Sequence, residues 1–278
     1  MKTNLYLIVL VLFLTTLCMG QQSTTVLLLG EKNPPQKPVE PGTESHQYYQ
    51  DGQVIAKCLN TISGIKTYRF EKWPDKSQLP ANIDVIVVLS YNAATSLYQP
   101  GNLDVFQQLM EKGVGLVAIH AGLFNRSNEI QHRPTMGYHL MNLGGIMSVQ
   151  MQKSGLTQDT LKVQKIKPDH PICQGWKEYT LHDEFYIRPT LLRGAQSLLK
   201  VQIDFDGETV HNIVAWTYER RQQNQGRSFG FMLGHYHTLY GKKEHITLVL
   251  NGILWAAQKT LPQGGYNCQL TANDFEIE

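Results

Sequence analysis

Two short stretches of this chain are apolar on both of their faces, and they constrain the fold more than any other feature. Residues 83–90 read IDVIVVLS, and residues 114–119 read VGLVAI. A strand that is buried on both faces belongs to a parallel sheet covered by helices, because an antiparallel sheet commonly leaves one face in water. The two stretches therefore predict an α/β sheet with these strands in its interior.

Strands and helices alternate through the first half of the chain. Strand patterns at 24–33 and 65–70 enclose a helical spacing of apolar residues at 54–62. Residues 102–112 predict another helix, with Asn102 as its cap. This order predicts a doubly wound, mostly parallel, flavodoxin-like sheet with helices on both faces and the first strand at its centre.

The second half of the chain has a different pattern. Polar turns such as FDGE join its strand-like segments, which favours antiparallel strands and hairpins that extend the sheet. A final amphipathic helix is predicted at 243–258. The strand-like segments are residues 161–166, 196–204, 209–218 and 228–233.

The first 20 residues have the pattern of a secretory signal peptide. Lys2 precedes an apolar run from Leu5 to Leu17, which is too short for a stable transmembrane helix. We expect cleavage after Gly20, no membrane association afterwards, and a secreted or periplasmic protein. Residues 263–278 show little pattern and are expected to form a C-terminal tail.

Charge and cysteine content argue against two classes of function. The formal charge of +2 has no basic run to focus it, so nucleic acid is not expected as a partner. Cys58, Cys173 and Cys268 follow the signal peptide. They form no disulfide framework and no pattern typical of thiol catalysis, although one bridge stays open. The oligomeric state also stays open, with a homodimer among the options.

One histidine stands where a buried strand ends. His120 follows VGLVAI and precedes Ala121 and Gly122, two small residues that permit a tight turn. Ligands of open α/β sheets bind at the carboxyl ends of the strands, so the turn is expected to lift His120 into a crevice. An imidazole there suits general acid–base catalysis or metal binding. The alternative is a structural histidine that caps a helix or bonds a buried carbonyl.

Three other segments carry polar residues that are expected to reach the same crevice: LHDEFY at 181–186, MLGHYHTLYG at 232–241 and PGTESHQYY at 41–49. On a regular strand, a His-x-His spacing turns both side chains the same way, which permits two metal ligands. A solvated turn or an exposed loop is the alternative for each segment. We predict His120, Asp183 and Glu184 as catalytic residues, His46, His182, Tyr186 and Tyr236 as substrate-binding residues, and His235 and His237 as ligands of a divalent metal, zinc or manganese.

These segments together resemble a known family. GVGLVAIHAG, DHPICQGW, HDEFY, VAWTYE…GRSFGFMLGHY and NGILWAA stand in the order found in trehalose-utilisation (ThuA-like) proteins. The resemblance covers residues 23–262. It implies the fold of class I glutamine amidotransferases, a link to sugar metabolism and a small carbohydrate as substrate. Those amidotransferases carry a cysteine nucleophile at the elbow where this chain has His120, so thiol-based amide hydrolysis is not expected.

The sequence departs from the family at two places. Many relatives have a histidine after a Gly-Gly pair, whereas LGGIMSVQMQ at 143–152 keeps Gly144 and Gly145 and lacks that histidine. Two residues separate Thr43 from His46, where close relatives have none. Either the pocket differs from that of the relatives or His46 is displaced.

Two functions fit these features. The first is cleavage of a glycoside or 3-keto-glycoside, by a hydrolase or a lyase, through histidine acid–base chemistry with metal assistance. A ketone acidifies the neighbouring C–H, so that a base removes this proton and the glycosidic oxygen leaves. The second is a non-catalytic carbohydrate-binding or partner-docking module, since several aromatic residues lie beside the polar segments.

Overall fold

The structure, a computed structural model, describes residues 23–32, 44–124, 133–147, 155–221 and 223–276. The predicted signal peptide at 1–20 lies outside these residues, and so does the part of LGGIMSVQMQ from residue 148 onwards. Among the described residues, no helix is long and apolar enough to cross a membrane.

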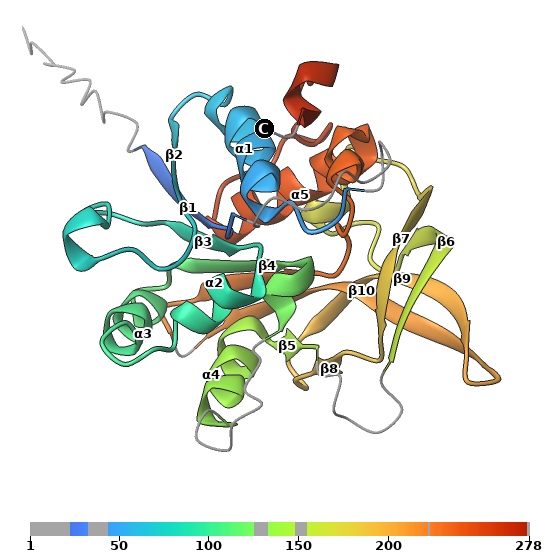
Figure 1. Cartoon of the computed structure of the whole chain (residues 1–278), viewed down its shortest axis with the longest axis horizontal. Helices are drawn as coiled ribbons and strands as arrows, with labels where there is room; N and C mark the ends of the chain where they lie inside the picture. The colour runs from blue at the N-terminus through green and yellow to red at the C-terminus, as the bar shows by residue number, and fades with distance from the viewer. Residues whose placement is uncertain (1–22, 33–43, 125–132, 148–154, 222, 277–278) are drawn as a thin grey trace, which may run out of the picture.

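A nine-stranded sheet runs through the molecule in the order β2-β1-β3-β4-β11-β10-β9-β6-β7 (Figure 1). Strands β2, β1, β3, β4 and β11 are parallel, and β10, β9, β6 and β7 extend the sheet in antiparallel fashion. The bounds are β1 Thr24–Leu29, β2 Ile65–Phe70, β3 Val85–Val88, β4 Gly115–Ile119, β6 Gly155–Lys165, β7 Tyr179–Ile187, β9 Gln196–Phe205, β10 Glu208–Arg220 and β11 Gly226–Phe231. A separate pair joins β5 (Gly145–Ile146) to β8 (Thr190–Leu191).

The predicted α/β fold with an antiparallel extension is confirmed, with two differences in detail. Strand β1 is internal but lies next to the edge strand β2, so it is not the central strand. The segment HDEFY belongs to β7, a strand that the polar residues at 182–184 concealed in the sequence.

Helices cover both faces of the parallel half (Figure 1). Helices α1 (Tyr48–Asn60) and α5 (Lys243–Ala256) lie on one face, and α2 (Tyr91–Ser96), α3 (Leu103–Glu111) and α4 (Arg133–Leu143) lie on the other. Asn102 precedes α3 as predicted, but its side chain donates to the Ser96 carbonyl instead of capping the helix. Short 3₁₀ segments follow β4 (η2, His120–Leu123) and β11 (η5, His237–Gly241).

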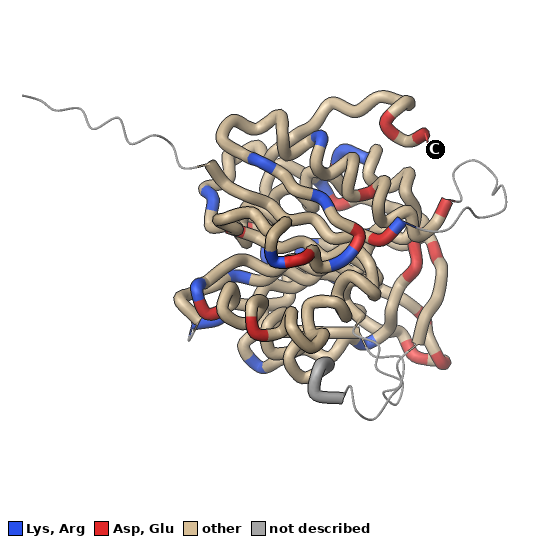
Figure 2. The backbone as a smooth tube through the Cα atoms, turned by 60° about the vertical axis from the view of Figure 1, so that its left-hand side comes forward, with Lys and Arg blue, Asp and Glu red and all other residues tan. Residues whose placement is uncertain are grey.

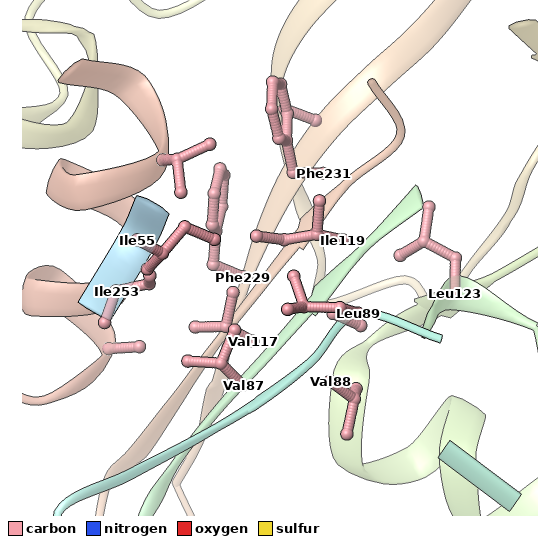
Figure 3. Packing of buried hydrophobic residues seen from close by; sticks show 14 of the residues in the cluster. Ile55, Val87, Val88, Leu89, Val117, Ile119, Leu123, Phe229, Phe231 and Ile253 are labelled. Atoms are coloured by element: carbon pink, nitrogen blue, oxygen red, sulfur yellow. The ribbon is translucent and has the colours of Figure 1, made fainter. Parts of the chain in front are cut away.

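The core is built from apolar residues in register on neighbouring strands (Figure 3). Val87 of β3 is opposite Val117 of β4, which is in turn opposite Phe229 of β11. Ile55 of α1 and Ile253 of α5 lie near this row, and all five side chains are fully buried. Burying an aliphatic side chain of this size contributes about 1.5–3 kcal/mol. The parallel half is therefore a rigid base for the turns at its carboxyl edge.

The C-terminal tail is fixed to α1. A disulfide joins Cys58 to Cys268. Further along the tail, Asp274 of the short segment η6 (Ala272–Phe275) pairs with Lys57. The ring of Phe275 lies 5.4 Å from that of His237. The bridge that the sequence left open is thus present, while Cys173 is a buried free thiol whose pKa burial raises to about 11.

Figure 2 marks the positions of charged residues along the backbone: lysines and arginines lie mainly at the left and in the middle of the view, and acidic residues are more frequent at its right. The formal charge of the whole chain is +2.

Candidate active site

His120 occupies a sharp turn at the carboxyl end of β4. Its backbone is left-handed, with φ +47°, a conformation that costs a non-glycine residue roughly 1–2 kcal/mol. Gly122 permits the turn, because a Cβ there would lie 2.2 Å from the Val88 carbonyl oxygen. The predicted strand–turn junction is therefore present, but the His120 side chain there is buried, with 1% of its surface exposed, and does not reach into an open crevice as expected.

His235 lies in the loop that follows β11. Gly234 has φ +113°, which favours glycine, and it turns the chain just before His235. Asp183 of β7 accepts hydrogen bonds from the Gly234 amide (2.8 Å) and the His235 amide (3.0 Å). Asp183 thus holds the loop through its backbone amides, and the His235 imidazole is left to contact other side chains.

His46 reaches the same place from the turn before α1. Its amide donates to the His235 carbonyl at 2.9 Å, and Ser45 forms a β-bridge with Tyr236. The Glu44 carbonyl accepts from the His237 amide. Glu44 and Ser45, the two residues that separate Thr43 from His46, thus pair with the His235 loop and bring His46 next to His235.

Four side chains from separate parts of the sequence meet in one cluster: His46, His120, Glu184 and His235. One nitrogen or carboxylate oxygen of each lies within 4.8 Å of those of the other three. His120 Nε2 and His235 Nδ1 are 3.2 Å apart, and Glu184 Oε2 lies 3.6 Å from both. Ligand atoms around a tetrahedral zinc with bonds of about 2.0–2.1 Å lie about 3.3 Å apart. The donor types and their spacing therefore fit a divalent cation such as zinc.

The hydrogen bonds of His120 fix which of its nitrogens faces the cluster. His120 Nδ1 lies 3.0 Å from the Met232 carbonyl oxygen, which only accepts, so Nδ1 carries the proton. In the neutral ring, Nε2 then presents its lone pair to His235, Glu184 and the Tyr186 hydroxyl. A backbone partner on the far nitrogen is the usual support of a metal-binding histidine.

Burial keeps the three imidazoles of the cluster neutral. Desolvation, followed by the repulsion of His235 and His46, lowers the pKa of His120 well below its usual value. Desolvation also lowers the pKa of His46, and it lowers the pKa of His235 to about 3 with smaller contributions from His46 and His182. A neutral imidazole offers the lone pair that both a metal and a proton require.

Glu184 and Tyr186 enter the cluster from the same face of β7, because residues two apart on a strand point the same way. The Tyr186 hydroxyl lies 2.9 Å from His120 Nε2. Desolvation raises the pKa of Glu184, and hydrogen bonds with Tyr186 and Gln158 oppose this rise. The Tyr186 hydroxyl has one proton, so it donates either to Glu184 or to His120 Nε2 at any one time. Gln158 also accepts from the Tyr236 hydroxyl at 3.2 Å, so β6 supports the carboxylate.

Asp183 and His237 lie close to the cluster but face other partners. Both oxygens of Asp183 accept from backbone amides, and burial raises its pKa to about 7 against these hydrogen bonds. His237 Nδ1 lies 2.6 Å from Asp51 Oδ1, and both side chains are buried. The His-x-His spacing therefore does not bring His235 and His237 to one point, because the segment is a loop and not a regular strand.

His182 and Tyr236 lie at the exposed side of the site. Their rings stack with centroids 5.7 Å apart, and the Tyr236 ring packs edge-on against His235 at 4.6 Å. His182 Nδ1 lies 3.1 Å from the Thr160 hydroxyl. The predicted substrate-binding residues thus divide between the buried Tyr186, the half-buried His46 and this outer pair of rings.

Sequence reasoning missed Gln158, Asp51 and the Met232 carbonyl. Gln158 lies on β6 opposite Glu184 in the strand register, and no local pattern marks it. Asp51 lies within α1, where an acidic residue in the first turn looks like an ordinary helix-dipole partner. The Met232 carbonyl gives no signal in a sequence at all.

A hollow in the described part of the chain lies elsewhere. It measures about 750 Å³ and is lined mainly by the end of β10 and the residue after it, from Thr217 to Arg221, together with His170 and Trp255. Tyr218 is opposite Ser228 near the start of β11, so the hollow lies at the edge of the sheet opposite the cluster. The chemistry of the cluster, and not the size of this hollow, identifies the candidate site.

A doubly wound α/β fold with a histidine–carboxylate cluster at the carboxyl edge of its parallel strands defines the class of this protein. Residues 40–256 match the model of a family described as ThuA, trehalose utilisation, and the chain belongs to that family. The family connects it to carbohydrate use. No curated protein matches the chain.

Solved structures support the same fold. A ThuA-like protein from Parabacteroides merdae is 16% identical with a TM-score of 0.61, and the match covers 92% of this chain and all of that one. A ThuA-like protein from Bacteroides uniformis is 18% identical with a TM-score of 0.57, covering 85% and 91%.

Proposed function

We propose that this protein cleaves a glycoside or 3-keto-glycoside at the cluster of His46, His120, Glu184 and His235. The observation that carries the proposal is the triangle of His120 Nε2, His235 Nδ1 and Glu184 Oε2, with sides of 3.2, 3.6 and 3.6 Å. The link of the family to trehalose utilisation supports a sugar as the substrate class.

The three imidazoles are the residues that would hold a divalent cation, zinc or manganese. When bound, such a cation polarises a carbonyl or hydroxyl oxygen of the substrate. The His120 tautomer, fixed by the Met232 carbonyl, keeps Nε2 directed at the cluster. This assigns His120 a ligand role in place of the catalytic base predicted from the sequence.

Glu184 is the proton-transfer group in this proposal. In a 3-keto-glycoside the carboxylate takes the proton from the carbon between the ketone and the anomeric carbon. The electron pair of that C–H bond forms a C=C bond, and the bond from the anomeric carbon to the glycosidic oxygen breaks. Glu184 then returns its proton to the departing oxygen, so the carboxylate is regenerated.

Sugar recognition is assigned to the outer residues. The stacked rings of His182 and Tyr236 offer an aromatic face beside His235, and aromatic faces with a few polar anchors suit a sugar ring. His46, assigned above to the cation, is half-buried at the same side, so a sugar ring on this face would lie next to the proposed metal site. The Cys58–Cys268 disulfide supports the proposed export, since stable disulfides persist in oxidising compartments.

The test uses mature protein without a histidine tag, analysed for zinc, manganese and nickel and incubated with 3-keto-disaccharides. We expect stoichiometric metal and monosaccharide release from the wild type. His235→Gln is expected to lose both, whereas its matched control His237→Gln keeps the metal. Glu184→Gln is expected to keep metal and lose turnover by roughly 10²–10⁴-fold. Sugar binding without metal or cleavage would instead identify a non-catalytic carbohydrate-binding module.

A further inference from the structure

We infer that Asp183 is a positioning residue whose carboxylate fixes the place of His235 and, through the His235 carbonyl, that of His46. The inference rests on the proposed function only where it predicts metal affinity. Its structural part concerns two turns of the chain and is measurable without any ligand.

The Asp183 carboxylate accepts hydrogen bonds from three backbone amides, at least one on each oxygen. Oδ2 accepts from the Gly234 amide at 2.8 Å, and Oδ1 accepts from the His235 amide at 3.0 Å and from the Glu184 amide at 2.9 Å. The side chain is fully buried. No oxygen of Asp183 is therefore directed at a substrate, which separates it from the neighbouring Glu184.

Strand alternation explains why adjacent carboxylates have different roles. Successive residues of β7 point to opposite faces, so Glu184 enters the cluster while Asp183 turns to the loop after β11. The loop needs this partner because Gly234 has φ +113° and β11 has already ended at Phe231. The two amides at 234 and 235 thus find their acceptor in a side chain of β7 and not in a neighbouring strand.

The position of His46 depends on the same anchor. The His46 amide donates to the His235 carbonyl, so the two histidines share one peptide contact at 2.9 Å. The bridge between Ser45 and Tyr236 extends this pairing by one residue on each side. Two of the three imidazoles that would hold a cation therefore depend on one carboxylate that touches neither ring.

Asp183→Asn is the variant that isolates this role. It keeps the shape of the side chain but replaces one acceptor oxygen with an amide NH₂ group, so at least one of the backbone donors loses its acceptor. Asn251→Asp is the matched control. Asn251 is also fully buried, donates to the Ile172 and Gln174 carbonyls and accepts from the Tyr266 amide, none of which belongs to the cluster.

Two measurements decide the inference: amide hydrogen exchange followed by NMR, and the zinc Kd from competition with a chromophoric chelator. For Asp183→Asn we expect exchange at the His235 and His46 amides to be at least about tenfold faster, and the zinc Kd to rise about 10–100-fold. Asn251→Asp is expected to change neither, although it destabilises the fold. Equal exchange and equal affinity in the two variants would overturn the inference.

The same design separates this inference from the proposed function. If the wild type binds no zinc, the proposed function fails, and the exchange rates alone decide whether Asp183 holds the two turns. If Asp183→Asn does not fold, Gly234→Ala displaces the loop from its other side, since a Cβ there would lie 2.8 Å from the Tyr240 hydroxyl oxygen. We expect faster exchange at His46 in that variant, and an unchanged rate would contradict the inference.

Discussion

The parallel and antiparallel halves of the sheet contribute to the cluster in different ways. The parallel half places His120 and His235 in turns that follow the ends of β4 and β11. The antiparallel extension supplies Glu184 and Tyr186 from within strand β7. Topology places a residue at a strand end, whereas register and alternation place a residue within a strand. In our proposal, the parallel half therefore holds the metal-binding imidazoles, and the antiparallel extension supplies the carboxylate and the hydroxyl beside them.

The largest expected effect tests the parallel half. Gly122→Ala puts a Cβ 2.2 Å from the Val88 carbonyl oxygen, so the turn at His120 has to shift. We expect the free energy of unfolding to fall by about 3 kcal/mol or more in urea denaturation, since the Cβ meets a backbone atom that no side-chain rotation can move. Gly137→Ala in α4 is the control, because its Cβ meets nothing within 4 Å and alanine favours a helix. Equal stability of the two variants would show that the turn is not tightly packed.

The second-largest effect concerns the Cys58–Cys268 disulfide, which lies on the same half of the molecule. Replacing Cys58 and Cys268 together by serine removes the disulfide that fixes the tail to α1. We expect a loss of about 2–4 kcal/mol in the free energy of unfolding, mainly because the unfolded chain gains freedom. Chemical reduction of the wild type should produce a similar loss. A double variant as stable as the oxidised wild type would mean that the tail adds nothing to the fold.

A pH effect tests the contact between helix α5 of the parallel half and strand β7 of the antiparallel extension. His245 of α5 contacts Tyr179 of β7 and Phe231 of β11, and burial lowers its pKa to about 3. The unfolded chain, with a pKa of about 6.5, holds this proton more tightly, so the stability that His245 contributes is complete above pH 6.5 and is lost as the pH falls towards 3. We expect His245→Phe to reduce the loss of stability between pH 7 and pH 5 by about 1–2 kcal/mol.

Urea denaturation at both pH values, with the disulfide intact, gives this difference. The exposed His211 provides a control, since His211→Phe should leave the pH dependence as it is in the wild type. A His245→Phe protein with the wild-type pH dependence would contradict the assignment.

The smallest expected effect belongs to the antiparallel half. Tyr186→Phe removes the hydroxyl that lies 2.9 Å from His120 Nε2 and hydrogen-bonds Glu184. We expect turnover or zinc affinity to change by about tenfold, the size of one lost hydrogen bond to a charged or metal-binding group. Tyr179→Phe removes a hydroxyl from the same strand that bonds His245 instead, and it should change neither quantity. Equal changes in both variants would point to a general disturbance of β7.

The division between the halves also explains what the sequence reveals. Buried apolar strands identify the parallel core, and a histidine beside small residues identifies the turn at His120. The sequence does not reveal that Glu184 and Asp183 diverge, because that depends on the pairing of β6, β7 and β9. It also misplaces His237, since the His-x-His rule assumes a regular strand, whereas Gly234 turns the chain and Asp51 of α1 takes up the imidazole.

The central claim is that imidazoles of the parallel half hold one cation beside the Glu184 carboxylate of the antiparallel extension. Anomalous diffraction at the zinc edge, from crystals of tag-free mature protein loaded with zinc, tests this most directly. The account predicts one dominant peak bound by the imidazole nitrogens of His46, His120 and His235, with the Glu184 carboxylate beside it. A dominant peak at any other group of residues, or no peak at this cluster at full zinc loading, would contradict it.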